Sequence, residues 1–374
     1  MENIKIKSLG PIKEADINFG DLTFFVGPQA SGKSIVLQLI KLLMDRAEIE
    51  RMLKKYGFVW SQNSRNNLEL FFGEGMADLW TERTDVLFDG INYPLNFLSS
   101  VKGYPQEQRD YEELLYIPAD RVLCLSNGWP RFFNDFDESA PFVLREFSEL
   151  LRLYLETGAL DRDTWPFGTA VDDIYLGGQI MIDRQKRKRL MLEINGAELP
   201  FMTWSSGQKE FFPLALSFDI LAPFEPRRLS HVNFIIVDEP EMGLHPAAIK
   251  SVILQIVGLI KRGYQVIVST HSPVLLEFAW AFNILKTEKA PAAAFDSLFD
   301  IDGNDKSNSF FDKNLIKKNI NTYYFNRVDG QVIVKDISSL DAGNEDLAVS
   351  EWGGLSSFAS KANDIVATIA ANNG

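Results

Sequence analysis

Two glycines separated by four residues and followed by Lys and Ser mark the stretch Gly27-Pro28-Gln29-Ala30-Ser31-Gly32-Lys33-Ser34. This spacing is typical of a loop that wraps around phosphates, because glycines let successive backbone N–H groups point inward. Lys33 is then expected to contact the β- and γ-phosphates of a nucleotide, and the hydroxyl of Ser34 is expected to ligate Mg²⁺. The alternative is a glycine-containing turn that carries a surface lysine.

The segments on either side of this loop favour the phosphate-binding interpretation. Residues 22–26 form a nearly continuous apolar run, which predicts a strand buried on both faces. From Ser34 to about Lys55 the apolar residues recur at helical spacing. A helix that starts at the loop adds the positive end of its dipole to the phosphate site.

A second group of polar residues follows the apolar run 234–237, which also predicts a buried strand. Asp238, at the carboxyl end of this strand, can hold the Mg²⁺ shell. Glu239 alternates to the other side, where it can orient and polarise an attacking water. A strand end exposed to solvent would explain an Asp-Glu pair on its own, but its combination with a phosphate loop favours the chemical role.

The stretch Trp204-Ser205-Ser206-Gly207-Gln208 opens a predicted helix, so its serine hydroxyl and N–H groups can donate to a phosphate. A pair of N-capping serines is the alternative. The stretch resembles the signature of ABC ATPases, Leu-Ser-Gly-Gly-Gln, with Ser205, Gly207 and Gln208 in register. Trp204 replaces the leucine and Ser206 the first glycine, a form similar to that of recombination and defence ATPases.

Two further stretches carry the same resemblance. Glu239-Pro240-Glu241-Met242-Gly243-Leu244-His245-Pro246 is similar to a segment of the SMC-like, RecF-like and OLD-like branch of these ATPases. His245 stands where transporter subunits have an aspartate at the dimer contact. His271, after the predicted strand 265–269, matches the family's switch histidine, which contacts the γ-phosphate. A structural histidine at a strand end is the alternative for His271.

The resemblance covers residues 1–26 with the phosphate loop, and residues 199–285. It implies an α/β fold, an ABC-ATPase head with a mixed central sheet flanked by helices, an N-terminal antiparallel β-subdomain and a helical insertion lobe. It also implies that ATP and Mg²⁺ are the cofactors, that Glu239, His271 and Lys33 are catalytic, and that Ser34 and Asp238 hold the metal. The phosphate loop and the signature Ser205–Gln208 would bind ATP, the signature facing the nucleotide of the partner in a head-to-tail homodimer or higher oligomer.

Patterning divides the chain into three expected parts. Residues 1–56 and 198–340 form the ATPase core, residues 57–197 an insertion, and residues 341–374 a tail with a short helix near 355–369. The insertion is expected to hold a helix at 142–157 and a β-meander at 174–200, with Asn195-Gly196 as a turn. A helix at 246–261 and a hairpin at 321–336, turning at Asp329-Gly330, are expected in the core and at its end.

Composition limits the partners of the chain. Its formal net charge of −13 repels nucleic-acid phosphate, so DNA binding would require a local basic patch. The single cysteine, Cys124, allows neither an internal disulfide nor a cysteine metal cluster. No apolar stretch approaches the ~18–20 residues of a membrane span, and the N-terminus does not resemble a signal peptide. These features predict a soluble cytoplasmic protein that does not bind membranes.

Four features leave their roles open. Arg184, Lys186, Arg187, Lys188 and Arg189 form a basic cluster that is either a solvated hairpin tip or a contact for nucleic acid or an acidic partner. Asp296, Asp300, Asp302 and Asp305 are expected to form an exposed acidic loop, because their spacing does not fit a calcium site. Arg121 could face the site or be an exposed arginine that pairs with Asp120 or Glu113. Gln62, Gln106 and Gln108 are the candidates for the glutamine loop of the family.

Three functions are compatible with these motifs. The first is the sensor or scaffold ATPase of a bacterial antiphage defence system that acts on a separate, nuclease-like effector, as the resemblance to OLD-like, Septu-like (PtuA-like) and PARIS-like (AriA-like) systems implies. The second is a RecF-like ATPase that clamps DNA for repair. The third, the motor subunit of a transporter, is disfavoured by the Gly243-Leu244-His245-Pro246 sequence and by an insertion far beyond ordinary loop lengths.

Overall fold

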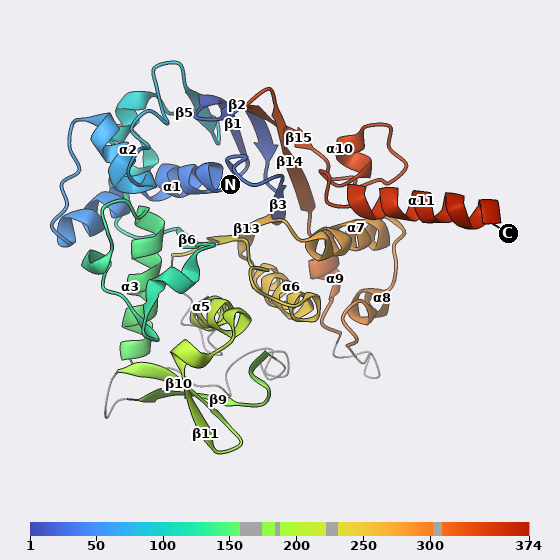
Figure 1. Cartoon of the computed structure of the whole chain (residues 1–374). Helices are drawn as coiled ribbons and strands as arrows, with labels where there is room; N and C mark the ends of the chain where they lie inside the picture. The colour runs from blue at the N-terminus through green and yellow to red at the C-terminus, as the bar shows by residue number, and fades with distance from the viewer. Residues whose placement is uncertain (158–173, 184–187, 222–230, 302–308, 374) are drawn as a thin grey trace. The chain divides into compact units, whose positions relative to one another are not determined.

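Apolar runs and alternating patterns form helices and strands throughout the part of the chain that the computed structural model describes (Figure 1). This part comprises residues 1–157, 174–183, 188–221, 231–301 and 309–373. The chain folds into two units. The first contains residues 1–33, 85–92 and 267–374, and the second contains residues 34–84 and 93–266.

The first unit is built on a mixed sheet. Its strands are β1 (Asn3–Leu9), β2 (Ile12–Asn18), β3 (Leu22–Val26), β4 (Asp85–Phe88), β5 (Ile91–Asn92), β14 (Ile320–Val328), β15 (Gln331–Asp336) and most of β13 (Gln265–Thr270). They lie in the order β5-β4-β1-β2-β15-β14-β3-β13. β1 runs antiparallel to both β2 and β4, whereas β14 runs parallel to β3. The structure thus confirms the mixed sheet and its antiparallel N-terminal part.

Local sequence explains the pairings. Alternation buries Ile4 and Ile6 of β1, which face Ile17 and Ala15 of β2. The predicted hairpin at 321–336 is present, and its turn residues Asp329 and Gly330 both have positive φ, 51° and 79°, as a two-residue turn between twisted strands requires.

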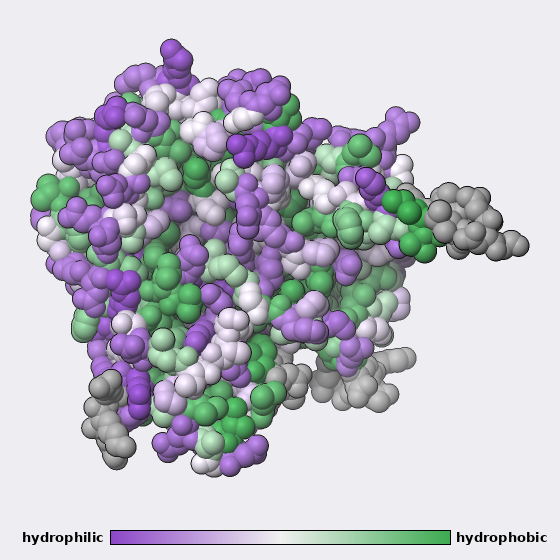
Figure 2. Space-filling model, viewed as in Figure 1, coloured by the Kyte–Doolittle hydropathy of each residue, from purple (hydrophilic) through white to green (hydrophobic). Residues whose placement is uncertain are grey.

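The helices of the first unit follow its last strands. They are α7 (Pro273–Thr287), α8 (Ala292–Ser297), α9 (Lys313–Ile316), α10 (Leu347–Ser350) and α11 (Ser357–Asn373). The tail helix is therefore present, two residues later than expected at its start. It leaves Phe358, Ile365 and Val366 exposed, and apolar atoms are visible beside the grey tip of this helix in Figure 2.

The second unit contains helices from both halves of the chain and the strand that ends at Asp238. Its helices are α1 (Lys33–Lys55, apart from Lys33), α2 (Ser64–Phe72), α3 (Phe142–Glu156), α5 (Ser206–Leu221) and α6 (Pro246–Lys261). Its strands are the parallel pair β6 (Leu114–Ile117) and β12 (Phe234–Asp238), the antiparallel β9 (Gln179–Asp183), β10 (Arg189–Ile194) and β11 (Ala197–Pro200), and the short hairpin β7 (Leu125–Ser126) and β8 (Trp129–Pro130). Short 3₁₀ turns are η1 (Leu95–Leu98), η2 (Pro105–Gln108), η3 (Arg121–Cys124), η4 (Phe133–Asp135) and η6 (Phe201–Thr203).

The helices at 142–157 and 246–261 and the β-meander near 174–200 are therefore present as expected. The division into an ATPase core, an insertion and a tail stays a prediction. No helix among the described residues is long and apolar enough to span a bilayer.

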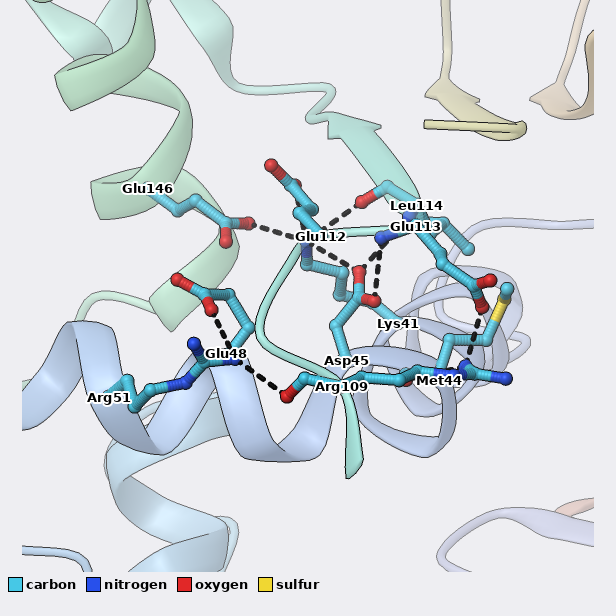
Figure 3. A network of polar contacts seen from close by, with 10 residues as sticks. All are labelled: Lys41, Met44, Asp45, Glu48, Arg51, Arg109, Glu112, Glu113, Leu114 and Glu146. Atoms are coloured by element: carbon cyan, nitrogen blue, oxygen red, sulfur yellow. Dashed lines mark hydrogen bonds and ion pairs between the residues drawn. The ribbon is translucent and has the colours of Figure 1, made fainter. Parts of the chain in front are cut away.

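A buried ionic network ties α1 to β6 and α3 (Figure 3). Lys41 is fully buried, and its Nζ lies 2.6 Å from Glu112 Oε1, 3.1 Å from Asp45 Oδ2 and 3.2 Å from Glu146 Oε2. Asp45 interrupts the helix with non-helical φ and ψ of −116° and 20°, and its carboxylate accepts from the backbone N–H groups of Glu113 and Leu114. The kink of α1 thereby fixes the start of β6.

Candidate functional site

The stretch Gly27–Ser34 lies between a buried strand and a helix, as the sequence predicts. β3 is buried over all five residues, the loop follows at Gly27, and α1 begins at Lys33. The Nζ of Lys33 donates to the carbonyls of Gly27 (2.9 Å) and Pro28 (3.0 Å), so the side chain folds back over the loop it belongs to. The lysine is only 5% exposed. A cation is thus held inside the curve of the loop, which suits a bound polyphosphate.

Two observations show that this loop fits a phosphate. Gly27 has φ of 149°, and a Cβ added there would lie 2.8 Å from the Phe325 carbonyl and 3.2 Å from Ser31 Oγ, so a side chain would fill the cradle. The Ser31 hydroxyl oxygen is buried and makes no hydrogen bond to the described residues. A buried hydroxyl inside a glycine-lined loop is suited to a phosphate oxygen.

His271 belongs to the same unit as the phosphate loop. It directly follows β13, which lies beside β3 in the strand order, and it is half-buried. The backbone N–H of Ser272 donates to Thr270 Oγ1 (2.9 Å), and α7 starts one residue later. His271 therefore lies in a tight connection between a buried strand and a helix.

The acidic residues lie in the second unit, at the end of β12. Asp238 is the last residue of this buried strand, and its Oδ2 accepts a hydrogen bond of 2.9 Å from the hydroxyl of Tyr116 on the neighbouring strand β6. Burial, followed by the charge of Asp238, raises the pKa of Tyr116 well above its usual value. The phenol therefore stays protonated at neutral pH and donates to Asp238, which holds that carboxylate in one orientation.

The backbone turns sharply at the next residue, Glu239, which has φ of 47°, in the left-handed region that non-glycine residues rarely adopt. The carbonyls of this turn accept hydrogen bonds from Arg121, which is 0% exposed. The alternative of an exposed arginine paired with Asp120 or Glu113 is therefore wrong. A guanidinium has five donors and can stay buried when carbonyls satisfy them, a role that local sequence does not reveal.

The signature stretch forms the N-terminus of α5. Ser205 Oγ accepts from the N–H of Gln208 (3.3 Å), and Gln208 Oε1 accepts from the N–H of Ser205 (3.0 Å), a reciprocal capping box. Gln208 is held further, because its Nε2 donates to the Ile174 carbonyl (3.1 Å) and its own carbonyl accepts from the Tyr175 hydroxyl (3.0 Å). The N–H groups of Ser206 and Gly207, in the first turn of the helix, have no acceptor within that helix.

The turn formed by residues 238–240 is called the acidic turn below. The signature packs against the segment that follows it. A Cβ added at Gly207 would lie 2.6 Å from the Gly243 carbonyl, so only glycine permits this close approach. A cavity of about 510 Å³ opens between the two segments, and its lining includes Ser205, Ser206, Gly207, Gln208, Gly243 and His245. His245 caps α6, because its Nδ1 accepts from the N–H of Ala247 (3.2 Å). Two helix N-termini thus border one cavity, an arrangement that favours an anionic ligand.

Adding a methyl group at position 207 tests how much the close contact between Gly207 and Gly243 matters. We expect Gly207→Ala to lower ATP turnover about 10- to 100-fold, because the signature must shift away from Gly243. ATP affinity of the isolated chain should stay within about threefold, since residues 27–33 of the phosphate loop belong to the other unit. Steady-state kinetics and equilibrium nucleotide binding measure both quantities. Gly343→Ala is the matched control, because a Cβ there meets only Asp341 Oδ1 at 3.4 Å; equal losses in both variants would contradict the expectation.

Other predicted features are explained by structural contacts or lie outside the described residues. Asp296 is buried and accepts from Ser309 Oγ and from the N–H of Phe311, so the expectation of an exposed loop is wrong for it, and Asp302 and Asp305 lie outside the described residues. The local sequence pattern could not show that the Asp296 carboxylate accepts a hydrogen bond from Ser309, 13 residues later in the chain. Among the described residues no group of three or more acidic, histidine or cysteine side chains could hold a metal.

The basic cluster and the glutamine candidates are also only partly described. Arg184, Lys186 and Arg187 lie outside the described residues, while Lys188 pairs with Glu156 (2.9 Å) and Arg189 with Asp183 (3.5 Å). Gln62 is exposed, and the side chain of Gln108 is not described. Gln106 is buried and donates to the Leu43 carbonyl and the Tyr93 hydroxyl, which is a packing role.

The α/β fold thus carries a glycine-rich loop before α1, an acidic residue at the end of β12 and a capped helix N-terminus at α5. Residues 141–277 match the family described as "AAA domain, putative AbiEii toxin, Type IV TA system". This segment holds the signature, the turn after Asp238 and His271, and it is similar to the AAA domains of that family.

Individual proteins show more limited similarity. A stretch of 57 residues is 49% identical to the Old nuclease of Escherichia phage P2, which is 15% of this chain and 10% of that protein. The chain thus spans about a tenth of the length of this relative. Among solved structures, it is similar to an Smc head bound to the C-winged helix domain of ScpA, with a TM-score of 0.43, 15% identity, and coverage of 90% of this chain and 96% of that one. For the SMC head domain from Thermotoga maritima the values are 0.38, 14%, 90% and 98%.

Proposed function

We propose that this chain binds ATP with Mg²⁺ and hydrolyses it to ADP and phosphate when two copies associate head to tail. The observation that carries the proposal is that one chain contains two places suited to an anion. One is the loop around Lys33, and the other is the cavity at the N-terminus of α5.

The chain's residues take the following roles in this proposal. The backbone of residues 27–32 and the Lys33 ammonium bind the phosphates, and Ser34 and Asp238 hold Mg²⁺, which when bound neutralises the phosphate charge. Glu239 accepts a proton from the attacking water. His271 contacts the γ-phosphate and keeps the water aligned.

Hydrolysis would depend on the partner for a geometric reason. Hydrogen bonds to the Ile174 carbonyl and from the Tyr175 hydroxyl fix Gln208 of the signature within its own unit. The N–H groups of the signature border a cavity that a γ-phosphate carried by a second copy would enter. Bound ATP then holds two copies together, and its hydrolysis lets them dissociate. Sizing with light scattering in Mg²⁺ with ATP, and again with ADP, tests this: full activity in a strictly monomeric sample would remove the partner's site from the proposal.

Replacing Lys33 tests the nucleotide site itself. Lys33→Ala is expected to weaken ATP affinity at least about tenfold, because a charge-assisted hydrogen bond to phosphate contributes about 1.5–3 kcal/mol. Binding of a fluorescent ATP analogue measures the affinity. Lys54→Ala, an exposed lysine near the other end of the same helix, is the control and should bind like the wild type. An unchanged affinity for Lys33→Ala would place ATP elsewhere.

We further propose that this ATPase is the sensor or scaffold of a bacterial antiphage defence system and controls a separate, nuclease-like effector. The proposal is supported by the family's description, which names a putative toxin of a TA system, and by the identity shared with a phage nuclease. Phage plating on cells that carry the wild-type locus or its Glu239→Gln variant tests the role. Protection that is lost in the variant supports it, and equal plating on both strains refutes it.

The two described members of the basic cluster are paired with carboxylates, so they do not favour a DNA clamp.

A further inference from the structure

Arg121 has an unusual set of contacts for a buried arginine. It begins η3, the next element after β6, and is 0% exposed. Its Nη1 donates to the carbonyls of Asp238 (3.3 Å) and Glu239 (3.2 Å), and its Nη2 to those of Glu239 and Pro240 (both 3.3 Å). Three consecutive carbonyls of the acidic turn are therefore held by one planar fork.

This contact falls where the backbone is strained. A non-glycine residue with φ of 47° is unfavourable, and such a residue persists only where its surroundings determine it. Both Nη atoms of Arg121 bind the carbonyl of Glu239, the strained residue itself. The carbonyls of Asp238 and Glu239 belong to the two peptide planes that flank the Glu239 Cα. Holding both planes restricts the direction in which the Glu239 side chain leaves the backbone.

The same guanidinium also reaches the signature helix. Its Nε donates to the carbonyl of Glu210 (3.1 Å), which lies in the second turn of α5. Burial lowers the pKa of Arg121, while the carboxylates of Glu210, Glu241, Asp238 and Glu239 oppose that effect, so the side chain stays charged at neutral pH. One cation thus joins the turn that carries Glu239 to the helix that carries Ser205–Gln208.

We propose that Arg121 is the positioning residue that fixes the peptide of Glu239 relative to the signature helix and so sets the rate of ATP hydrolysis. This role rests on the proposed function, in which Glu239 activates the water. All three guanidinium nitrogens of Arg121 donate to backbone carbonyls, so the residue acts through the turn and not on the reacting atoms. An arginine that only stabilised the fold would affect unfolding without acting selectively on turnover.

Arg121→Lys separates these two roles. Lysine keeps the charge and can hold one carbonyl or two, but it lacks the planar fork. We expect kcat to fall about 10- to 100-fold, because small displacements of a catalytic group are costly. KM and the Kd for ATP should stay within about threefold, since the phosphate loop is unchanged.

Arg145→Lys is the matched control. Arg145 is 1% exposed in the same unit, and its guanidinium likewise binds backbone carbonyls, those of Asp137, Glu138 and Ala140. Both variants should lose similar thermal stability, but only Arg121→Lys should lose turnover beyond what its folded fraction explains. An unchanged kcat in Arg121→Lys, or an equal fall in both variants, overturns the proposal.

The outcome for the proposed function can be separated from that for Arg121. If the wild type does not hydrolyse ATP, or Glu239→Gln hydrolyses it normally, the proposed function fails. If the wild type is active and depends on Glu239 but Arg121→Lys is unimpaired, only the role of Arg121 fails. Should Arg121→Lys not fold, ¹⁵N-arginine spectra of the wild type decide: the guanidinium signal of Arg121 should shift when Mg²⁺ and ATP are added, and a signal that does not change overturns the proposal.

Discussion

Glu239→Gln should reduce ATP turnover by about 10²- to 10⁴-fold while leaving ATP affinity near that of the wild type, because a positioned general base contributes a factor of that size. Glutamine preserves the shape of the side chain and its place after β12, but an amide cannot accept the proton of the attacking water. The left-handed backbone at this position and the bonds from Arg121 do not involve the carboxylate, so the turn should keep its conformation.

The same variant should accumulate as a dimer in Mg²⁺ and ATP, since bound nucleotide can no longer be removed by hydrolysis. Phosphate release and light scattering measure the two effects on one sample. Glu198→Gln, the same exchange on the exposed edge of β11, is the control and should match the wild type in both assays. Turnover near the wild-type rate in Glu239→Gln would assign the base to another residue, and a monomer that retains ATP would contradict the head-to-tail association.

The elements of this fold that sequence predicts well are those with strong local signals. α6 begins and ends where expected, because Pro246 suits the first helical turn and the apolar residues keep helical spacing to Lys261. The hairpin β14–β15 and the turn at Asn195-Gly196 follow from residues that accept positive φ. The phosphate loop, the acidic turn and the signature are all predicted from short contiguous motifs.

The strand β4 shows where local reasoning fell short. It lies within residues 57–197, for which helices and a β-meander were expected, yet it pairs with β1 of the first unit. The turn Asp89-Gly90 that joins it to β5 is a hairpin signal, and both residues have positive φ, 47° and 77°. The hairpin could thus have been predicted from sequence, but its pairing with a strand about 80 residues earlier could not, because nothing in the local pattern names the partner.

The contacts that support the candidate site are of the same long-range kind. Tyr116 and Asp238 are 122 positions apart, and Arg121 and Glu239 are 118 apart. A single tyrosine or arginine carries no periodic signal, so its partner is known only from the fold. Motifs therefore predict the groups that would do chemistry, while the groups that hold them in place emerge from the structure.

Lys41→Met is expected to destabilise the protein by about 3–5 kcal/mol, because it leaves a buried cluster of carboxylates without its cation. In the wild type, burial favours the neutral amine, but Glu112, Glu146 and Asp45 outweigh this and raise the pKa of Lys41 above its ordinary value (Figure 3). The ammonium is therefore a permanent part of the core. Urea unfolding measures the loss, and Lys5→Met, which removes an exposed ion pair with Asp16, should change stability by no more than about 0.5 kcal/mol.

The loss in Lys41→Met should also grow with pH. Burial raises the pKa of Glu146 well above its ordinary value of 4.5, and Lys41 opposes that rise, so removing the lysine raises the pKa further. Above pH 4.5 the Glu146 carboxyl of the unfolded chain loses its proton, whereas that of the folded variant keeps it. The free energy of unfolding therefore falls as pH rises from 4.5 through the raised pKa of the folded state. The deficit should therefore be smaller at about pH 5.5 than at about pH 8, and adding Glu146→Gln should recover part of it at the higher pH. A deficit independent of pH would mean that Lys41 stabilises the core by packing and hydrogen bonds to Leu114 rather than by its charge.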